Sequence, residues 1–186
     1  MDIKPLIAAS FSPEEAEAYA AYSLSDADRA ALAATGTDLL KRFPPIPAAC
    51  LAMSSLHSVL LEKHVKQKAY VVVGSLYADH VRVFGEDGEL DGKRFSQSDP
   101  SWDGHGWIVL GDQLADASLF RTARSGKGHP ALAALVKREV SPQAGMMICK
   151  ASDTEKSGLR YEARYVLTQD QVDGLARGAA RLMGAF

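Results

Sequence analysis

Polar and apolar residues alternate with helical spacing along the first forty residues. The stretch SPEEAEAYAAYSL opens with Ser12, a residue type that caps helices, followed by Pro13 at the first helical position and two glutamates in the first turn. The stretch SDADRAALAATGTDLLKRF repeats this start at Ser25, and its alanines and leucines follow at helical intervals. We therefore expect residues 1–45 to be helical as far as PPIPAA, whose prolines favour an extended backbone.

The pattern then changes from helix to strand. From about Ala49 to Lys66, apolar residues such as Leu51, Val59 and Val65 recur at helical intervals. The stretch AYVVVGSLYAD follows, and its β-branched and aromatic residues are typical of a buried strand. HVRVFG predicts a further strand, and the polar stretch EDGELDGKRFSQSDPSWDG predicts a long loop.

The second half of the chain adds strands and two helices. HGWIVLG and QLADASLF predict two short strands joined by a tight turn at Gly111 and Asp112. After the basic loop RTARSGKGHP come a short helix in ALAALVKREV, strand candidates in AGMMICKAS and LRYEARYVLT, and a closing helix capped by Thr168. The strands follow one another without βαβ alternation, so the expected fold is α+β, with N-terminal helices packed on an antiparallel sheet.

Length, charge and cysteine content narrow the class of protein. A chain of 186 residues with a formal net charge of -2 suits one domain over residues 1–186, without the basic surface of a nucleic-acid binder. Cys50 and Cys149 form no CxxC pair, so neither a zinc site nor a disulfide framework is indicated. No run of residues approaches the length of a membrane span or a signal peptide. We expect a cytoplasmic protein that binds neither nucleic acid nor membranes.

Four residues suggest chemistry. His105 stands at the head of one predicted strand, Trp107 lies two residues on and so on the same face, and Asp116 lies on the next strand. Adjacent antiparallel strands can bring the histidine beside the aspartate. Cys50 opens the predicted helix, where the helix dipole, free N–H groups and a nearby imidazolium would stabilise a thiolate.

This order of residues resembles the transglutaminase-like branch of the papain-like cysteine hydrolases, a superfamily that also holds the arylamine N-acetyltransferases. The resemblance covers roughly residues 46–120, as a catalytic core between a helical part (1–45) and C-terminal strands and a helix (121–186). It implies Cys50 as nucleophile, His105 as base and Asp116 as the residue that orients the base. The expected activity is acyl transfer to or from, or hydrolysis of, an amide, peptide or thioester, with no cofactor. The expected partner is a small-molecule or peptide acyl substrate.

The chain also departs from this family around Cys50. PAA precedes the cysteine, where many members have glycine and a bulky residue. Pro44 stands six residues upstream, where a papain-type enzyme has its oxyanion glutamine. These departures favour an alternative, in which a catalytically inactive papain-like domain acts as a binding or interaction module. In that case Cys50 would be a small apolar core residue, as we expect for Cys149.

Three residues are candidates for substrate contact. Trp102 ends the long polar loop just before His105, and we expect this loop to border a cleft. Trp107 shares the face of His105, and His57 shares a helical face with Cys50 and either lines the cleft or packs in the core.

Other polar residues fit chemistry less well. His57 and His64 are spaced seven residues apart, about 10 Å along a helix axis, which is too far for them to share one metal ion, so no metal site is expected. Asp103 and Asp112 are rivals of Asp116 as the orienting residue, but both fall in loops or turns.

The stretch RSGKGHP superficially resembles a phosphate-binding loop. A Walker A motif would need glycine where the chain has Arg121, and serine or threonine where it has Gly128. An NTPase is therefore not supported, and a loop that contacts an anion stays open.

Overall fold

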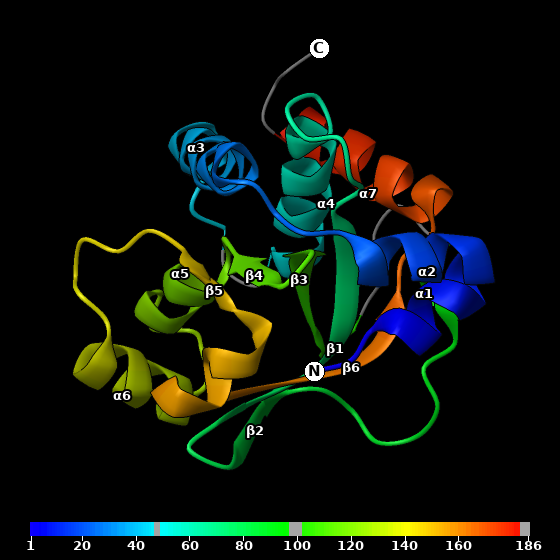
Figure 1. Cartoon of the computed structure of the whole chain (residues 1–186). Coiled ribbons are helices and arrows are strands. Elements are labelled where there is room, and N and C mark those ends of the chain that lie inside the picture. Colours follow the sequence, from blue (N-terminus) through cyan, green and yellow to red (C-terminus); the bar gives the residue numbers. More distant parts are fainter. Residues whose placement is uncertain (47–48, 97–101, 183–186) are drawn as a thin grey trace.

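Residues 1–46, 49–96 and 102–182 are described by a computed structural model of the chain (Figure 1). Within them the strands form one six-stranded antiparallel sheet, which confirms the expected α+β fold. The strands are β1 (Tyr70–Ala78), β2 (Val81–Phe84), β3 (His105–Leu110), β4 (Gln113–Asp116), β5 (Met147–Lys150) and β6 (Leu159–Val166).

Strand β1 is the centre of the sheet. Its first half pairs with β3 on one edge, and the stretch from Val72 to Ala78 pairs with β6 on the other edge. The end of β1 pairs with β2 on the same edge that β3 occupies earlier along the strand. Phe84, the last residue of β2, therefore lies close to His105, the first residue of β3. The hairpin of β3 and β4 then leads to β5 at the outer edge.

Two of the N-terminal helices begin where the sequence predicts them, because their caps are local. The Ser12 hydroxyl accepts a hydrogen bond from the backbone of Glu15 at 3.2 Å, and Ser25 forms a reciprocal capping box with Asp28. The helices are α1 (Lys4–Ser10), α2 (Pro13–Ala21), α3 (Asp26–Arg42), α4 (Cys50–Leu61), α5 (Leu119–Arg124), α6 (Pro130–Glu139) and α7 (Gln169–Leu182), with short 3-10 helices at Gly92–Ser96 and Ala151–Ser157.

Two hydrophobic cores cover the two faces of the sheet, since successive strand residues point to opposite sides. Val72 and Trp107 belong to the core shared with α1, α2, α5 and α6. Val71 and Ile108 belong to the core shared with α3, α4 and α7, which lie together on one side of the sheet in Figure 1. Helix α4 thus packs on the sheet with Cys50 at its first position, as expected.

One predicted strand is shorter than expected. We expected QLADASLF to be a strand throughout, but β4 ends at Asp116 and α5 begins at Leu119. The reason is the Asp116 carboxylate, which accepts hydrogen bonds from the backbone N–H groups of Ser118 and Leu119, both at 3.0 Å, and so starts a helical turn.

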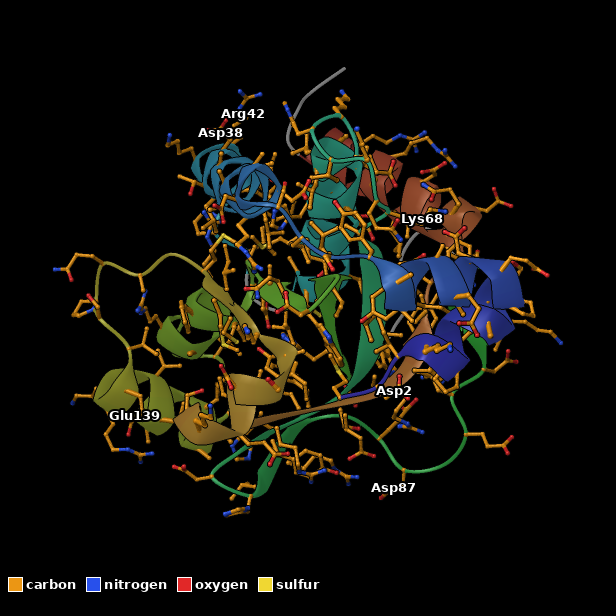
Figure 2. All side chains as sticks on the ribbon, viewed as in Figure 1. Asp2, Asp38, Arg42, Lys68, Asp87 and Glu139 are labelled. Atoms are coloured by element: carbon orange, nitrogen blue, oxygen red, sulfur yellow. The ribbon has the colours of Figure 1, made fainter. Side chains whose placement is uncertain are left out.

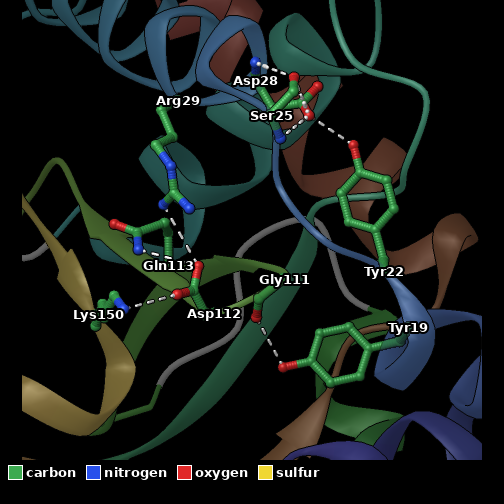
Figure 3. A network of polar contacts seen from close by, with 9 residues as sticks. All are labelled: Tyr19, Tyr22, Ser25, Asp28, Arg29, Gly111, Asp112, Gln113 and Lys150. Atoms are coloured by element: carbon green, nitrogen blue, oxygen red, sulfur yellow. Dashed lines mark hydrogen bonds and ion pairs between the residues drawn. The ribbon is translucent and has the colours of Figure 1, made fainter.

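A polar network ties the N-terminal helices to the β3–β4 turn (Figure 3). The Tyr19 hydroxyl donates to the carbonyl oxygen of Gly111 at 3.0 Å. The carboxylate of Asp112 forms ion pairs with Arg29 at 3.5 Å and Lys150 at 3.7 Å. Asp112 therefore belongs to this turn rather than to His105.

The long polar loop divides into two parts. Phe95 is buried in the core beside α7, and the carbonyl oxygen of Gly92 accepts a hydrogen bond from Gln171 at 2.8 Å. This part covers α7 and β6, whereas the end of the loop, from Trp102 to Gly104, borders the cavity that contains Cys50. The stretch 97–101 lies outside the described residues.

Charged side chains such as Asp38, Asp87 and Glu139 point outward from the molecule (Figure 2). Among the helices of the described residues, none combines the length and the apolar character needed to cross a membrane.

Candidate active site

Cys50 is held over the start of β3 by a glycine. A Cβ atom on Gly106 would lie 3.2 Å from the Leu51 side chain and 3.6 Å from the Cys50 backbone, so the bare glycine lets the first turn of α4 lie directly on the strand. The Cys50 sulfur lies 3.8 Å from the carbonyl oxygen of Gly104. No described side chain caps this end of α4, so its first N–H groups have no side-chain acceptor.

His105 and Asp116 form a buried pair. The Nε2 atom of His105 lies 2.5 Å from Oδ2 of Asp116, and both side chains are at most 1% exposed. Antiparallel pairing of β3 with β4 brings the two residues together across the hairpin, as expected.

Both oxygens of the Asp116 carboxylate accept hydrogen bonds. Its Oδ1 atom accepts hydrogen bonds from the backbone and hydroxyl of Ser118 and from the backbone of Leu119, each at 3.0 Å. Its Oδ2 atom accepts from the Tyr161 hydroxyl at 2.9 Å as well as from His105. Burial alone would raise the pKa of Asp116, but His105 and these donors hold it below its ordinary value of 3.8. Asp116 is therefore an ionised carboxylate.

The electrostatics of His105 follow from the same contacts. Burial would lower the pKa of its ring, but the Asp116 carboxylate and the Cys50 sulfur outweigh burial and raise the pKa above its ordinary value of 6.5. Since Nε2 faces a carboxylate, this nitrogen carries a proton. The Nδ1 atom has no hydrogen-bond partner among the described residues and is the nitrogen left to serve Cys50.

Aromatic rings fix the orientation of His105. Phe84 stacks on it with ring centroids 4.9 Å apart, and Trp107 lies nearly parallel to it at 6.2 Å. Tyr161 packs edge-on against Trp107 at 5.0 Å and donates its hydroxyl to Asp116. Burial and Asp116 raise the pKa of Tyr161, so this hydroxyl stays a donor.

A cavity of about 570 Å³ opens onto the cysteine and the histidine. Its described lining consists of Cys50 and His105, Val83 and Phe84 of β2, residues 102–104, and Thr122 with residues 127–129. The arrangement thus combines a thiol, an imidazole, an oriented carboxylate and helix N–H groups without a side-chain cap beside a space of substrate size.

The three candidates for substrate contact are placed differently. Trp102 lines the cavity, where its ring lies over Gly104. Trp107 is fully buried under Tyr161, and His57 is 1% exposed between α3 and α4. Neither of these two lines the cavity among the described residues, so the expectation that they contact substrate is not supported. The sequence indicated that Trp107 shares a strand face with His105 and that His57 shares a helix face with Cys50. It did not indicate which neighbouring residues cover these two side chains.

His57 instead joins two helices. Its Nε2 atom lies 3.1 Å from the carbonyl oxygen of Leu32 and 3.1 Å from the Thr35 hydroxyl. Its core location is the other of the two placements that the sequence allowed. Burial lowers its pKa from 6.5 to about 4, partly offset by the contact with Leu32.

This burial predicts acid sensitivity of the fold. Between pH 6.5 and pH 4 the unfolded chain binds a proton at His57 that the folded chain excludes, so the free energy of unfolding falls as the pH falls. From pH 7 to pH 5 this residue should account for a loss of about 2 kcal/mol. Urea unfolding at both pH values should show a smaller loss for His57→Gln, which keeps a donor for Leu32 but cannot titrate. An equal loss in both proteins would contradict the assignment.

The rival residues do not replace the pair. Asp103 lines the cavity but makes no hydrogen bond with His105 among the described contacts, and Asp112 belongs to the turn network. His64 is exposed near the end of α4. Within the described ranges no group of three histidine, cysteine or acidic side chains could hold a metal ion.

Two contributors to the site were missed from the sequence. Tyr161 lies in LRYEARYVLT and Phe84 in HVRVFG, both of which were recognised as strands. The alternation of polar and apolar residues in LRYEARYVLT could have marked Tyr161 as inward-facing, but only the pairing of β6 with β1 places it beside Asp116.

Comparisons with models of known families, with curated proteins and with solved structures found no match to this chain.

Proposed function

We propose that the protein is a cysteine-dependent enzyme that transfers or hydrolyses an acyl group held as an amide, peptide or thioester. The observation that carries this proposal is that Cys50 and His105 line one cavity, while the buried Asp116 is hydrogen-bonded to His105. The order of these residues, and their places on a helix and two neighbouring strands, also support the resemblance to transglutaminase-like proteins.

The proposed reaction has two half-reactions. The Cys50 thiolate attacks the substrate carbonyl, and the backbone N–H groups at the start of α4 stabilise the oxyanion that forms. The Nδ1–H of the His105 imidazolium donates its proton to the leaving amine or thiol, which leaves a thioester on Cys50. His105 then takes a proton from water or from an acceptor amine, which attacks the thioester and restores the thiol.

The charge state of His105 suits this role. Its raised pKa keeps the ring protonated at neutral pH, beside an Asp116 whose lowered pKa keeps it ionised. An imidazolium next to Cys50 stabilises the thiolate that makes the first attack and is ready to act as the acid. The hydrogen bond of Asp116 to Nε2 fixes the ring and leaves Nδ1 as the nitrogen available to Cys50.

The second candidate is a papain-like domain without activity that serves as a binding module. The observation that favours it is the burial of Cys50, which is only 7% exposed. An enzyme must admit a carbonyl compound to the sulfur, whereas a module needs no such access. Reactivity of the thiol therefore distinguishes the two candidates.

Free thiols also bear on the proposed location. Both cysteines are unpaired, and a thiolate nucleophile persists best in a reducing compartment. A cytoplasmic location is therefore part of the proposal.

Selective alkylation tests the proposed function. Iodoacetamide at pH 6 should alkylate Cys50 at least about tenfold faster than Cys149, because only Cys50 has an imidazolium partner. Burial, reinforced by Asp153, raises the pKa of Cys149 and so suppresses its thiolate. Mass spectrometry of the peptides measures both rates in the same molecule.

The unfolded chain provides the control for this experiment. In concentrated urea both thiols should react at similar rates, which would show that the selectivity belongs to the folded site. Slow and equal labelling of the two cysteines in the folded protein would instead favour the binding module.

A further inference from the structure

A second wall of the cavity comes from the loop between α5 and α6. Residues 127–129 line the same space as Cys50. Gly126 has a φ of +71°, in the left-handed region that favours glycine, and a Cβ on Gly128 would lie 2.6 Å from the carbonyl oxygen of Thr122. These two glycines let the loop turn back against the end of α5, which keeps it at the cavity.

Lys127 brings a positive charge to this wall. Among the ion pairs of the described residues, none involves Lys127. The nearby Arg121 and Arg124 differ in this respect, because they donate to backbone carbonyl oxygens, such as those of Phe43 and Ser141. The ammonium of Lys127 is exposed and therefore accessible to a ligand in the cavity.

We propose that the acyl substrate carries a carboxylate that faces Lys127 while its carbonyl carbon reaches Cys50. This inference rests on the proposed function, because it names the substrate class of the same cavity. A sphere of the cavity's volume is about 10 Å across, so a group bound at Cys50 lies within about one Debye length of this wall. The attraction between the ammonium and a carboxylate is only partly screened over that distance.

Two further features act on an anion in the cavity. Helix α6 begins directly after the loop, so its positive end lies on the same wall as Lys127. Asp103 has the opposite effect, since it is exposed and lines the cavity with a negative charge. It forms no ion pair with Lys127 among the described contacts, so the two charges act separately on a ligand.

Two small alkylating reagents test this proposal without a known substrate. Iodoacetate carries a carboxylate, whereas iodoacetamide is neutral and of nearly the same size. Each forms a bond from the Cys50 sulfur to carbon and releases iodide. The readout is the ratio of their two rate constants at Cys50, because this ratio cancels any change in the reactivity of the thiol itself.

Lys127→Gln should lower the iodoacetate-to-iodoacetamide ratio about threefold at low ionic strength, and Asp103→Asn should raise it. Both shifts should shrink in molar salt, where charges are screened within about 3 Å. Lys137→Gln is the matched control, since Lys137 is exposed on α6 and does not line the cavity among the described residues. It makes the same change in net charge and should leave the ratio unaltered.

The possible outcomes separate the two proposals. If Cys50 reacts with both reagents but Lys127→Gln behaves like Lys137→Gln, the carboxylate assignment is wrong and the proposed function stands. If Cys50 reacts with neither reagent in the folded chain, the proposed function itself fails. A lower ratio in Lys127→Gln, with no change in Lys137→Gln, supports the carboxylate-bearing substrate.

Discussion

Replacing His105 with alanine should slow the acylation of Cys50 by about a hundred- to ten-thousandfold, the range that a positioned acid–base group contributes. In the proposed mechanism the ring lies beside Cys50 and acts as the acid and base that moves protons during the reaction. Acylation can be followed with p-nitrophenyl acetate, which transfers its acetyl group to the sulfur and releases p-nitrophenolate. Intact mass then shows the acetyl group on the protein, and peptide mapping places it on Cys50.

Two further variants distinguish a catalytic defect in His105→Ala from misfolding. His105→Ala leaves the Asp116 carboxylate buried without its main partner, which destabilises the fold. His105→Gln keeps a side chain that can donate to Asp116, so it should fold better and still acylate slowly. His64→Ala changes an exposed histidine outside the cavity and should acylate at the original rate.

Added imidazole gives a further readout. A small base that enters the space left in His105→Ala should restore part of the acylation rate, whereas a purely structural loss would not respond. If His105→Ala and His105→Gln both acylate Cys50 as fast as the unmodified chain, His105 is not the base and the proposed mechanism is wrong.

The parts of the fold that the sequence predicted depend on local physics. The starts of α2 and α3 could be recognised because Ser12 and Ser25 cap them through residues three positions away. The pairing of His105 with Asp116 could be predicted because one tight turn joins β3 to β4. The end of β4 could not, since Leu119 and Phe120 are apolar enough for a strand, and only the hydrogen bonds of Asp116 turn them into a helix.

The parts of the site that were missed depend on distant segments. Tyr161 reaches Asp116 from 45 residues away, across a strand pairing that no local pattern specifies. The side chain of Trp107 points toward this tyrosine and is covered by it, which a strand face alone cannot reveal. The second wall of the cavity requires residues 127–129 to fold back to the cavity that contains Cys50, which depends on tertiary packing rather than on sequence periodicity.

Substitution of Asp116 should have the largest effect on the free energy of unfolding. Asp116→Ala leaves a buried imidazolium, the Tyr161 hydroxyl and two backbone N–H groups without their acceptor. Removing one partner of a buried charged pair typically lowers stability by about 3–5 kcal/mol. Tyr161→Phe removes a single hydroxyl from the same carboxylate and should lower stability by only about 1–2 kcal/mol.

The stabilising effect of the pair has a defined pH window. The lowered pKa of Asp116 means that its contribution is complete above pH 3.8 and is lost as the pH falls through the folded-state pKa. The raised pKa of His105 means that its contribution is complete below pH 6.5 and is lost as the pH rises through the folded-state pKa. Urea unfolding should therefore show the largest difference between the unmodified chain and Asp116→Ala between these two values.

Asp116→Asn separates the structural part of this role from the catalytic part. The amide oxygen can still accept from the backbone of Ser118 and Leu119, so α5 should start as before and stability should fall less than in Asp116→Ala. Its amide nitrogen would face Nε2 of His105 and favour the tautomer with the proton on Nδ1, so the ring could no longer accept a proton at the nitrogen that serves Cys50. We expect acetylation of Cys50 by p-nitrophenyl acetate to slow by about a hundredfold or more in Asp116→Asn. The rate should change far less in Tyr161→Phe, which keeps the carboxylate. If Asp116→Asn unfolds at the expected urea concentration and still acylates at the original rate, Asp116 is a helix cap and not the residue that orients His105.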